Sequence, residues 1–202
     1  MPRSRLGELV SLAEEDGLVT ADHARQAGFT DSVLIRLVQH GRIERTSRGV
    51  YRVPYLTPSR FSQYREAVLW ARANRGLAQV AISHATALAA YGISDANPHS
   101  IHITVPRAAR LRRQKPKGII VHHEDLRTED ITVHEGMPIT TIARTVADLL
   151  KSGERIDLIR QAISDARRGG FIQASEAKQL RRRVEDAYRA LLDLETAHRR
   201  LR

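Results

Sequence analysis

The sequence contains no cysteine, which excludes disulfides, cysteine nucleophiles and thiolate metal sites. It also has no run of roughly 18 apolar residues, the length that a membrane-spanning helix needs. The chain starts Met-Pro-Arg-Ser-Arg and then becomes amphipathic, without the apolar stretch of a secretory signal. We therefore expect a cytoplasmic protein with no membrane partner.

Common enzyme motifs are absent as well. The sequence has no phosphate-binding glycine-rich loop, no H-E-x-x-H and no G-x-S-x-G. Nine histidines are present, but His122 and His123 are adjacent on a predicted strand, so their side chains point to opposite faces. His99 and His102 flank the start of another strand without a paired carboxylate motif. We predict no catalytic residue, no cofactor, no metal and no small-molecule substrate.

One histidine keeps an enzymatic alternative open. His84 follows Ser83 at a predicted strand-to-helix junction, where helix capping is the simplest explanation. Together with Asp95, Glu124 and Asp125, His84 could also form a nuclease-like cluster. The enzymatic alternative is therefore a protein that processes nucleic acid.

Lysine is scarce, since only four of the 33 basic residues are lysines and the others are arginines. The planar guanidinium suits phosphate and guanine, although a GC-rich genome also encodes arginine freely. The net charge of +10 favours a polyanionic partner. Residues 1–58 carry eight basic and seven acidic side chains, whereas residues 59–202 carry 25 and 16. Most of the positive charge therefore lies in the second segment.

Three short helices are predicted at the start of the chain. Residues 4–16 space their apolar side chains as a helix does. Thr20 can cap a second helix, and Thr30 can cap a third helix with an apolar inner face. The apolar residues of that inner face are Val33, Leu34, Leu37 and Val38.

A basic hairpin follows these helices. Residues 42–53 predict two short strands around a turn at Thr46–Gly49. Three helices and a basic hairpin make a winged helix-turn-helix, which we assign to residues 1–54. Two prolines lie just after the hairpin, and we predict a linker at 55–59.

The rest of the chain, residues 60–202, predicts a mixed α/β domain with a helical C-terminus, so the whole chain is expected to be α+β. Short strands are predicted at 80–83, 101–105, 119–123, 131–133 and 137–139. Helices are predicted at 60–75, 84–91, 141–152, 154–168 and 175–201.

The last predicted helix has apolar residues at spacings of three and four over more than three heptads. They are Ala177, Leu180, Val184, Ala187, Leu191, Leu194, His198 and Leu201. This seam either packs on the helix's own domain or receives a partner or a second copy of the chain.

The third helix is the predicted recognition helix, because its polar side is free to enter the major groove of double-stranded DNA. Arginine can recognise guanine there, and glutamine can recognise adenine. The candidate residues on this side are Ser32, Arg36, Gln39 and His40. The hairpin offers further contacts to the DNA backbone through Arg45, Thr46, Ser47 and Arg48.

A basic loop at 106–118 carries six cations and no anion. Its candidate phosphate contacts are Arg107, Arg110, Arg112, Arg113, Lys115 and Lys117. Such a loop would supply the positive field that the first 58 residues lack. The alternative is a solvated connector between two strands, and an acidic protein partner would suit the loop as well as DNA.

Four stretches of the chain resemble the AbiEi-type antitoxins of type IV toxin–antitoxin systems. They are the N-terminal segment ending in Arg48-Gly-Val-Tyr-Arg52, residues 83–94 (SHATALAAYGIS), residues 97–107 (NPHSIHITVPR) with GIIVH at 118–122, and residues 136–149 (GMPITTIARTVADL). The resemblance covers residues 1–170, and residues 171–202 are the least covered.

This resemblance implies a transcriptional repressor that binds inverted repeats in the promoter of its own operon through the winged domain. It also implies that the C-terminal domain acts against a nucleotidyltransferase-type toxin and that its basic charge assists DNA binding. Family members are not enzymes. The alternative from the residues themselves is a winged-helix module that binds only proteins, which the near-neutral charge of residues 1–58 leaves open.

Overall fold

The computed structural model describes residues 5–13, 17–54, 58–72, 79–112 and 114–200, with side chains up to residue 193. The predicted linker at 55–59 therefore lies mostly outside the described residues. The fold is α+β, as predicted. The chain divides into two compact units, Met1–Val80 with Ile103–Asp125, and Ala81–His102 with Leu126–Arg202.

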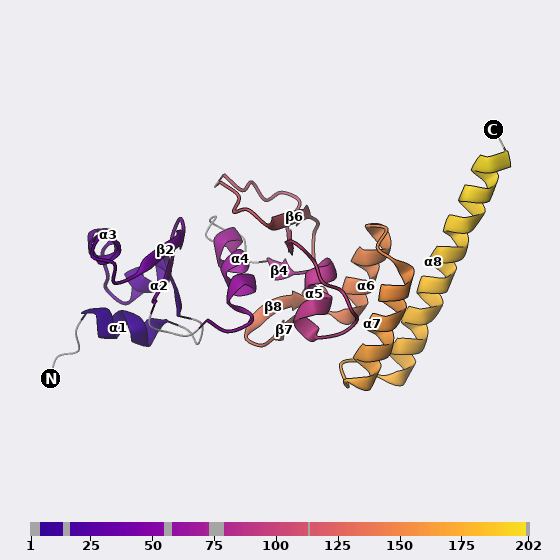
Figure 1. Cartoon of the computed structure of the whole chain (residues 1–202), viewed down its shortest axis with the longest axis horizontal. Coiled ribbons are helices and arrows are strands. Elements are labelled where there is room, and N and C mark those ends of the chain that lie inside the picture. Colours follow the sequence, from indigo (N-terminus) through magenta and orange to yellow (C-terminus); the bar gives the residue numbers. More distant parts are fainter. Residues whose placement is uncertain (1–4, 14–16, 55–57, 73–78, 113, 201–202) are drawn as a thin grey trace. The chain divides into compact units, whose positions relative to one another are not determined.

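The N-terminal elements surround a small antiparallel sheet with the strand order β1-β3-β2 (Figure 1). The helices are α1 (Arg5–Leu12), α2 (Ala21–Gln26) and α3 (Asp31–Gln39). The strands are β1 (Leu18–Thr20), β2 (Glu44–Ser47) and β3 (Val50–Arg52). The three predicted helices and the hairpin are all present, whereas β1 was not predicted.

Two threonines begin helices in this unit as predicted. The Thr20 hydroxyl accepts a hydrogen bond from the His23 amide at 3.1 Å, and the Thr30 hydroxyl accepts one from the Val33 amide at 3.4 Å. Each bond satisfies a backbone donor of the first helical turn, which has no partner inside the helix. The strand β1 directly precedes α2, so Thr20 both ends the strand and caps the helix.

Apolar side chains from every N-terminal helix and from the sheet meet in one core. Its most buried members include Leu9 of α1, Val19 of β1 and Leu34 of α3, each with no exposed surface. The predicted inner residues Val33, Leu37 and Val38 are partly buried and pack against this core. Burial of apolar surface is the main force that holds such a small unit together.

The helix α4 (Ser62–Arg72) follows and contacts β1 and β3. Arg52 of β3 donates a hydrogen bond from Nη2 to Glu66 Oε2 of α4 at 2.8 Å, and both side chains are about three-quarters buried. The predicted boundary between two domains at residues 54–60 stays a prediction.

The second sheet has five strands in the order β6-β5-β4-β8-β7. The strands are β4 (Ala81–Ile82), β5 (Ile101–Val105), β6 (Ile119–His123), β7 (Ile131–His134) and β8 (Met137–Thr140). The sheet is mixed, because β4 pairs with β8 in parallel whereas β7 and β8 form an antiparallel hairpin. Glu135 and Gly136 both have positive φ angles, which suits the tight two-residue turn of that hairpin.

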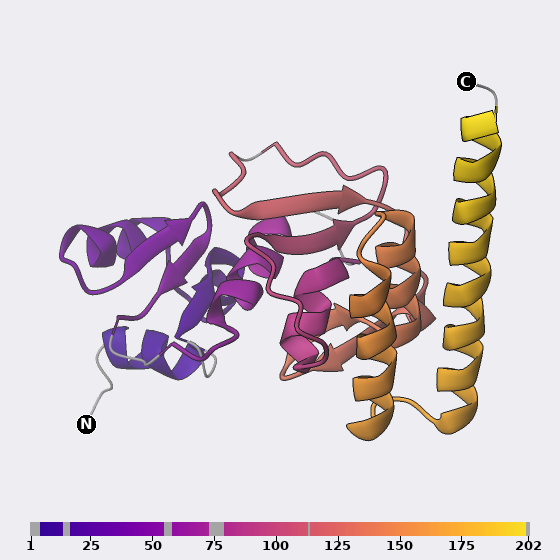
Figure 2. The same cartoon turned by 45° about the vertical axis from the view of Figure 1, so that its right-hand side comes forward.

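Four further helices complete the chain, and α6, α7 and α8 lie side by side (Figures 1 and 2). The helices are α5 (His84–Tyr91), α6 (Ile142–Lys151), α7 (Ile156–Arg168) and α8 (Ala174–Arg200). On α8, Leu180 and Val184 are buried, whereas Leu191 is 51% exposed. The first half of the predicted seam therefore packs within the chain.

A buried ion-pair network joins α6 to the turn Thr128–Asp130 that precedes β7. Arg144 donates from Nε to Asp148 Oδ1 at 2.7 Å and from Nη1 to Asp130 Oδ2 at 3.2 Å. The Asp148 and Asp130 side chains are 3% and 10% exposed. Burial raises the pKa of Asp148 by more than the hydrogen bond and charge of Arg144 lower it.

None of the helices among the described residues is long and apolar enough to cross a membrane.

We predict that Arg144→Met lowers the free energy of unfolding by about 3–5 kcal/mol, because it leaves the Asp148 carboxylate buried without its cation. The pKa of Asp148, already raised in the folded protein, should rise further. A group with a raised folded pKa stabilises the fold below its unfolded pKa and loses this contribution as the pH rises through the folded value. The loss measured by urea unfolding should therefore be larger at neutral than at acidic pH.

The exposed Arg127, which also pairs with Asp130, provides the control for this variant. Arg127→Met should have a much smaller effect, because solvent screens an exposed ion pair. Combining Arg144→Met with Asp148→Leu should restore most of the stability. A loss for Arg144→Met no greater than that for Arg127→Met would contradict the assigned role.

Candidate nucleic-acid interface

A tight corner connects α2 to α3. Gly28 has a φ of +82°, a left-handed conformation that glycine adopts without strain. The Phe29 amide then donates to the Ala24 carbonyl at 2.9 Å, and the Phe29 side chain is buried. Arg25 of α2 donates from Nε to Asp31 Oδ1 of α3 at 3.3 Å. These contacts set the direction of α3 relative to α2.

The helix α3 has one buried side and one exposed side. Leu34 has no exposed surface, whereas the predicted contact residues Ser32, Arg36, Gln39 and His40 are all exposed. The Ser32 hydroxyl lies 2.8 Å from the Thr30 hydroxyl in the first turn. Sequence reasoning did not single out Ile35, which is 54% exposed on the same helix. The structure thus presents a continuous polar side with one apolar residue beside it.

The four candidate residues of the hairpin differ in their exposure to solvent. Arg45 and Arg48 are exposed, whereas Thr46 and Ser47 are half-buried. The hydroxyl oxygens of Thr46 and Ser47 are buried and have no hydrogen-bond partner among the described residues. The register of β2 against β3 shifts between Arg45 and Ser47. The side chains here therefore do not alternate regularly between the two faces of the sheet. The two arginines are therefore the accessible cations of the hairpin.

The basic loop between β5 and β6 exposes its cations to solvent. The exposed residues are Arg107, Arg110, Arg112, Lys115 and Lys117, and Arg113 lies outside the described residues. The start of the loop is held in place, because the Arg107 amide donates to Asp125 Oδ1 at 3.0 Å. The Ala109 amide also donates to the Pro106 carbonyl at 2.9 Å. An ordered start followed by several exposed cations is a suitable shape for contacting phosphates.

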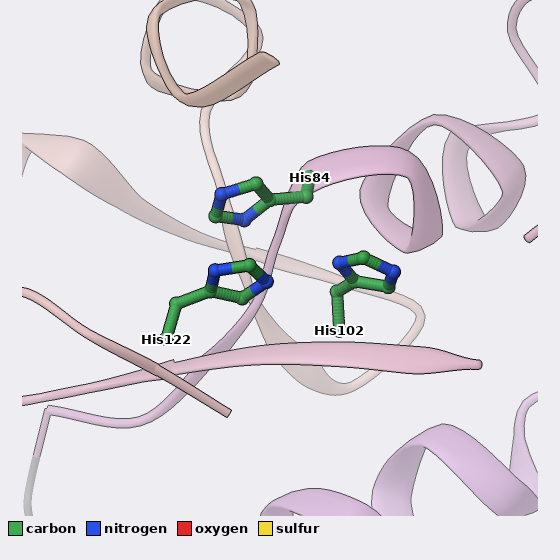
Figure 3. A group of neighbouring side chains, drawn as sticks. All are labelled: His84, His102 and His122. Atoms are coloured by element: carbon green, nitrogen blue, oxygen red, sulfur yellow. The ribbon is translucent and has the colours of Figure 1, made fainter. Parts of the chain in front are cut away.

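Three histidine side chains from different parts of the sequence form a group. The ring nitrogens of His84, His102 and His122 that could bind a metal all lie within 4.8 Å of one another (Figure 3). His84 is buried, and His102 and His122 are half-buried. Sequence reasoning grouped His84 with Asp95, Glu124 and Asp125 but not with His102 or His122, and it therefore missed this group. Within the described part of the chain, this group contains no carboxylate, and the suggested nuclease-like cluster stays a hypothesis.

Helix capping does not explain the positions of Ser83 and His84 at the start of α5. Ser83 occupies the position before α5, but its side chain makes no capping hydrogen bond. Its hydroxyl lies 3.0 Å from His84 Nδ1 instead. His84 itself has a φ of +54°, which is uncommon for a residue with a side chain. Burial lowers the pKa of His102, with the charge of Glu154 acting in the opposite direction, so the neutral imidazole is favoured.

Two family models match the chain. The model "Transcriptional regulator, AbiEi antitoxin" matches residues 8–54, and the model "AbiEi antitoxin C-terminal domain" matches residues 79–162. Together they span more than half of the sequence.

The chain belongs to the AbiEi antitoxin family.

The AbiEi match confirms the resemblance drawn from the sequence. The first model includes α3 and the hairpin, and the second includes the histidine group and the basic loop. Neither model reaches α8. Both descriptions are of regulator and antitoxin domains rather than of enzymes.

The comparison with solved structures supports the fold of this AbiEi protein. The crystal structure of the RV2827C protein from Mycobacterium tuberculosis is similar with a TM-score of 0.52 and 13% sequence identity. The similarity covers 87% of this chain and 70% of that one. At this identity the likeness concerns the fold alone. A search of curated proteins found no match.

We predict that Thr30→Ala lowers the free energy of unfolding by about 1 kcal/mol, because it removes the side-chain acceptor at the start of α3. Thr30→Ser is the matched control, since it keeps the hydroxyl oxygen and should stay close to the wild type. Thermal and urea unfolding of the full chain measure both variants. Equal stability of the alanine and serine variants would show that the 3.4 Å contact to Val33 is not a working cap.

Proposed function

We propose that this AbiEi protein is a winged helix-turn-helix repressor that binds the promoter of its own operon and acts as the antitoxin of a type IV toxin–antitoxin system. The observation that carries the proposal is the exposed polar side of α3, opposite the buried Leu34. This helix lies inside the segment that matches the transcriptional-regulator model. A buried apolar side and an exposed polar side are what a recognition helix requires.

The exposed side of α3 has the chemistry to distinguish bases. Ser32, Arg36 and Gln39 are spaced by four and three residues, so they share one side of the helix. Arginine can bind guanine through two hydrogen bonds, and glutamine can bind adenine in the same way. The exposed Ile35 adds an apolar surface that suits the methyl group of thymine. Ser32 lies in the first helical turn, where base edges or phosphates are approached most closely.

Phosphate contacts would come from outside α3. Arg45 and Arg48 of the hairpin are exposed, and so are five described cations of the basic loop. Residues 1–58 have nearly equal numbers of basic and acidic side chains, so their own field attracts DNA only weakly. We propose that the loop supplies the missing sequence-independent attraction.

The antitoxin role rests on the family, since residues 79–162 match the model of the AbiEi antitoxin C-terminal domain. The partner that we propose for this domain is a cognate toxin of the nucleotidyltransferase type. Binding of inverted repeats would bring two copies of the chain onto one promoter.

We predict that Arg36→Ala weakens binding to the promoter by about 1–3 kcal/mol and leaves binding to a shuffled duplex nearly unchanged. Fluorescence anisotropy with labelled duplexes at a fixed salt concentration measures both affinities. Arg182→Ala is the control, because this arginine is 86% exposed on α8, outside both family models.

An equal loss on both duplexes would make Arg36 a phosphate contact rather than a base contact. If the wild type bound neither duplex but captured a partner protein, the chain would instead be a protein-binding module. The near-neutral charge of residues 1–58 is the observation that favours this second candidate.

We predict that replacing Arg110, Arg112 and Lys115 with glutamine reduces the salt dependence of DNA binding. Each lost phosphate contact should make the negative slope of log affinity against log salt shallower by about 0.9. The matched control replaces the exposed Arg181, Arg182 and Arg183 of α8 with glutamine, which removes the same charge elsewhere. An equal change of slope in both triple variants would mean that net charge, and not the loop, is responsible.

A further inference from the structure

An acidic side chain lies in the first turn of α3, and the proposed function gives it no role. Asp31 is the first residue of this helix, and its side chain is 71% exposed. A carboxylate accepts hydrogen bonds but cannot donate them, and phosphates repel it. Its presence on a helix proposed to enter the major groove therefore requires an explanation.

Arg25 of α2 holds this carboxylate across the corner between the two helices. It donates from Nε to Asp31 Oδ1 at 3.3 Å and from Nη1 to Asp22 Oδ1 at 2.5 Å, so one guanidinium joins two carboxylates. The positive charge of Arg25 offsets the repulsion between Asp31 and the phosphates of a bound duplex. No described residue donates a hydrogen bond to Asp31 Oδ2, so this oxygen can accept one from a ligand.

Asp31 has an exposed apolar neighbour on the same helix. Residues four apart lie next to each other on a helix, so Asp31 adjoins Ile35, which is 54% exposed. The two residues form a second exposed row beside the row of Ser32, Arg36 and Gln39. The first turn of a recognition helix is also where base edges are approached most closely. Asp31 therefore lies where a carboxylate can reach a base.

We propose that Asp31 selects a cytosine in the promoter and that Arg25 is the positioning residue that holds its carboxylate. This inference rests on the proposed function, since it takes α3 to be the recognition helix. Cytosine presents an amino-group donor in the major groove, whereas guanine and thymine present acceptor oxygens that repel a carboxylate. Adenine has the acceptor N7 beside its amino group, which suits an amide rather than a carboxylate.

Asp22 separates this role from a purely structural one. A carboxylate in the first turn also interacts favourably with the helix dipole, and this applies to both aspartates. Asp22 lies in the first turn of α2, is 68% exposed and bonds to the same arginine. The two residues thus serve their helices and the ion pair alike, but only Asp31 belongs to α3. A difference in base preference between their variants therefore reports contact with DNA.

The experiment selects binding sites for the full chain from a library of randomised duplexes and sequences the enriched ones. We expect cytosine at one position of the wild-type site. Asp31→Asn should prefer adenine there and keep the other positions, because asparagine can bind adenine through two hydrogen bonds. With duplexes that differ only at this position, each protein should favour its own base by about 5- to 150-fold.

The matched control is Asp22→Asn, which removes the same charge beside Arg25 and should keep the preference for cytosine. Arg25→Met should lower this preference without replacing cytosine by another base. Thermal unfolding identifies any variant that fails to fold. If the wild type and folded Asp31→Asn enrich the same site, the role of Asp31 is overturned while the proposed function stands. If the wild type enriches no sequence, the proposed function fails together with this inference.

Discussion

Burial of Leu34 fixes which side of α3 faces outward, and the candidate interface depends on this constraint. Leu34 has no exposed surface and belongs to the same core as Leu9 and Val19. Because a helix repeats every 3.6 residues, anchoring this one position directs Ser32, Arg36 and Gln39 toward solvent. Rotating α3 to bury its polar residues would expose the apolar Leu34 to water and leave polar groups in the core without hydrogen-bond partners. Both changes would destabilise the fold.

Much of the fold could be predicted from local sequence patterns. The bounds predicted for 84–91, 101–105 and 119–123 agree with α5, β5 and β6, because apolar spacing and flanking turn residues mark them clearly. The caps at Thr20 and Thr30 were also predictable, since capping depends on a few adjacent residues. The strand β1 was missed because three residues are too few to show a period, and its pairing with β3 depends on contacts between residues 30 to 34 positions apart.

The candidate site was less predictable than the fold. Exposure of Arg36 and Gln39 followed from helix periodicity, whereas the buried hydroxyls of Thr46 and Ser47 follow from a local irregularity in the hairpin that the sequence does not mark. The histidine group was missed for another reason. His84, His102 and His122 have no motif spacing, and only the order of strands in the sheet brings them together. The one available signal was Ser83-His84 at a strand-to-helix junction, which was interpreted as helix capping.

The proposed function would also explain the charge distribution. The nearly neutral segment 1–58 would carry the base-reading side chains, while the basic loop at 106–118 would supply attraction that does not depend on sequence. Specificity and affinity could then change independently. A short recognition helix would then be sufficient, because cations outside it would hold the protein on the DNA backbone.

Hydrogen–deuterium exchange of the full chain, with and without its promoter duplex, tests whether α3 contacts DNA. We expect the amides of residues 31–40 to exchange more slowly with the promoter than with a shuffled duplex of equal length. Unchanged exchange across residues 31–40 in a chain saturated with promoter DNA would contradict it.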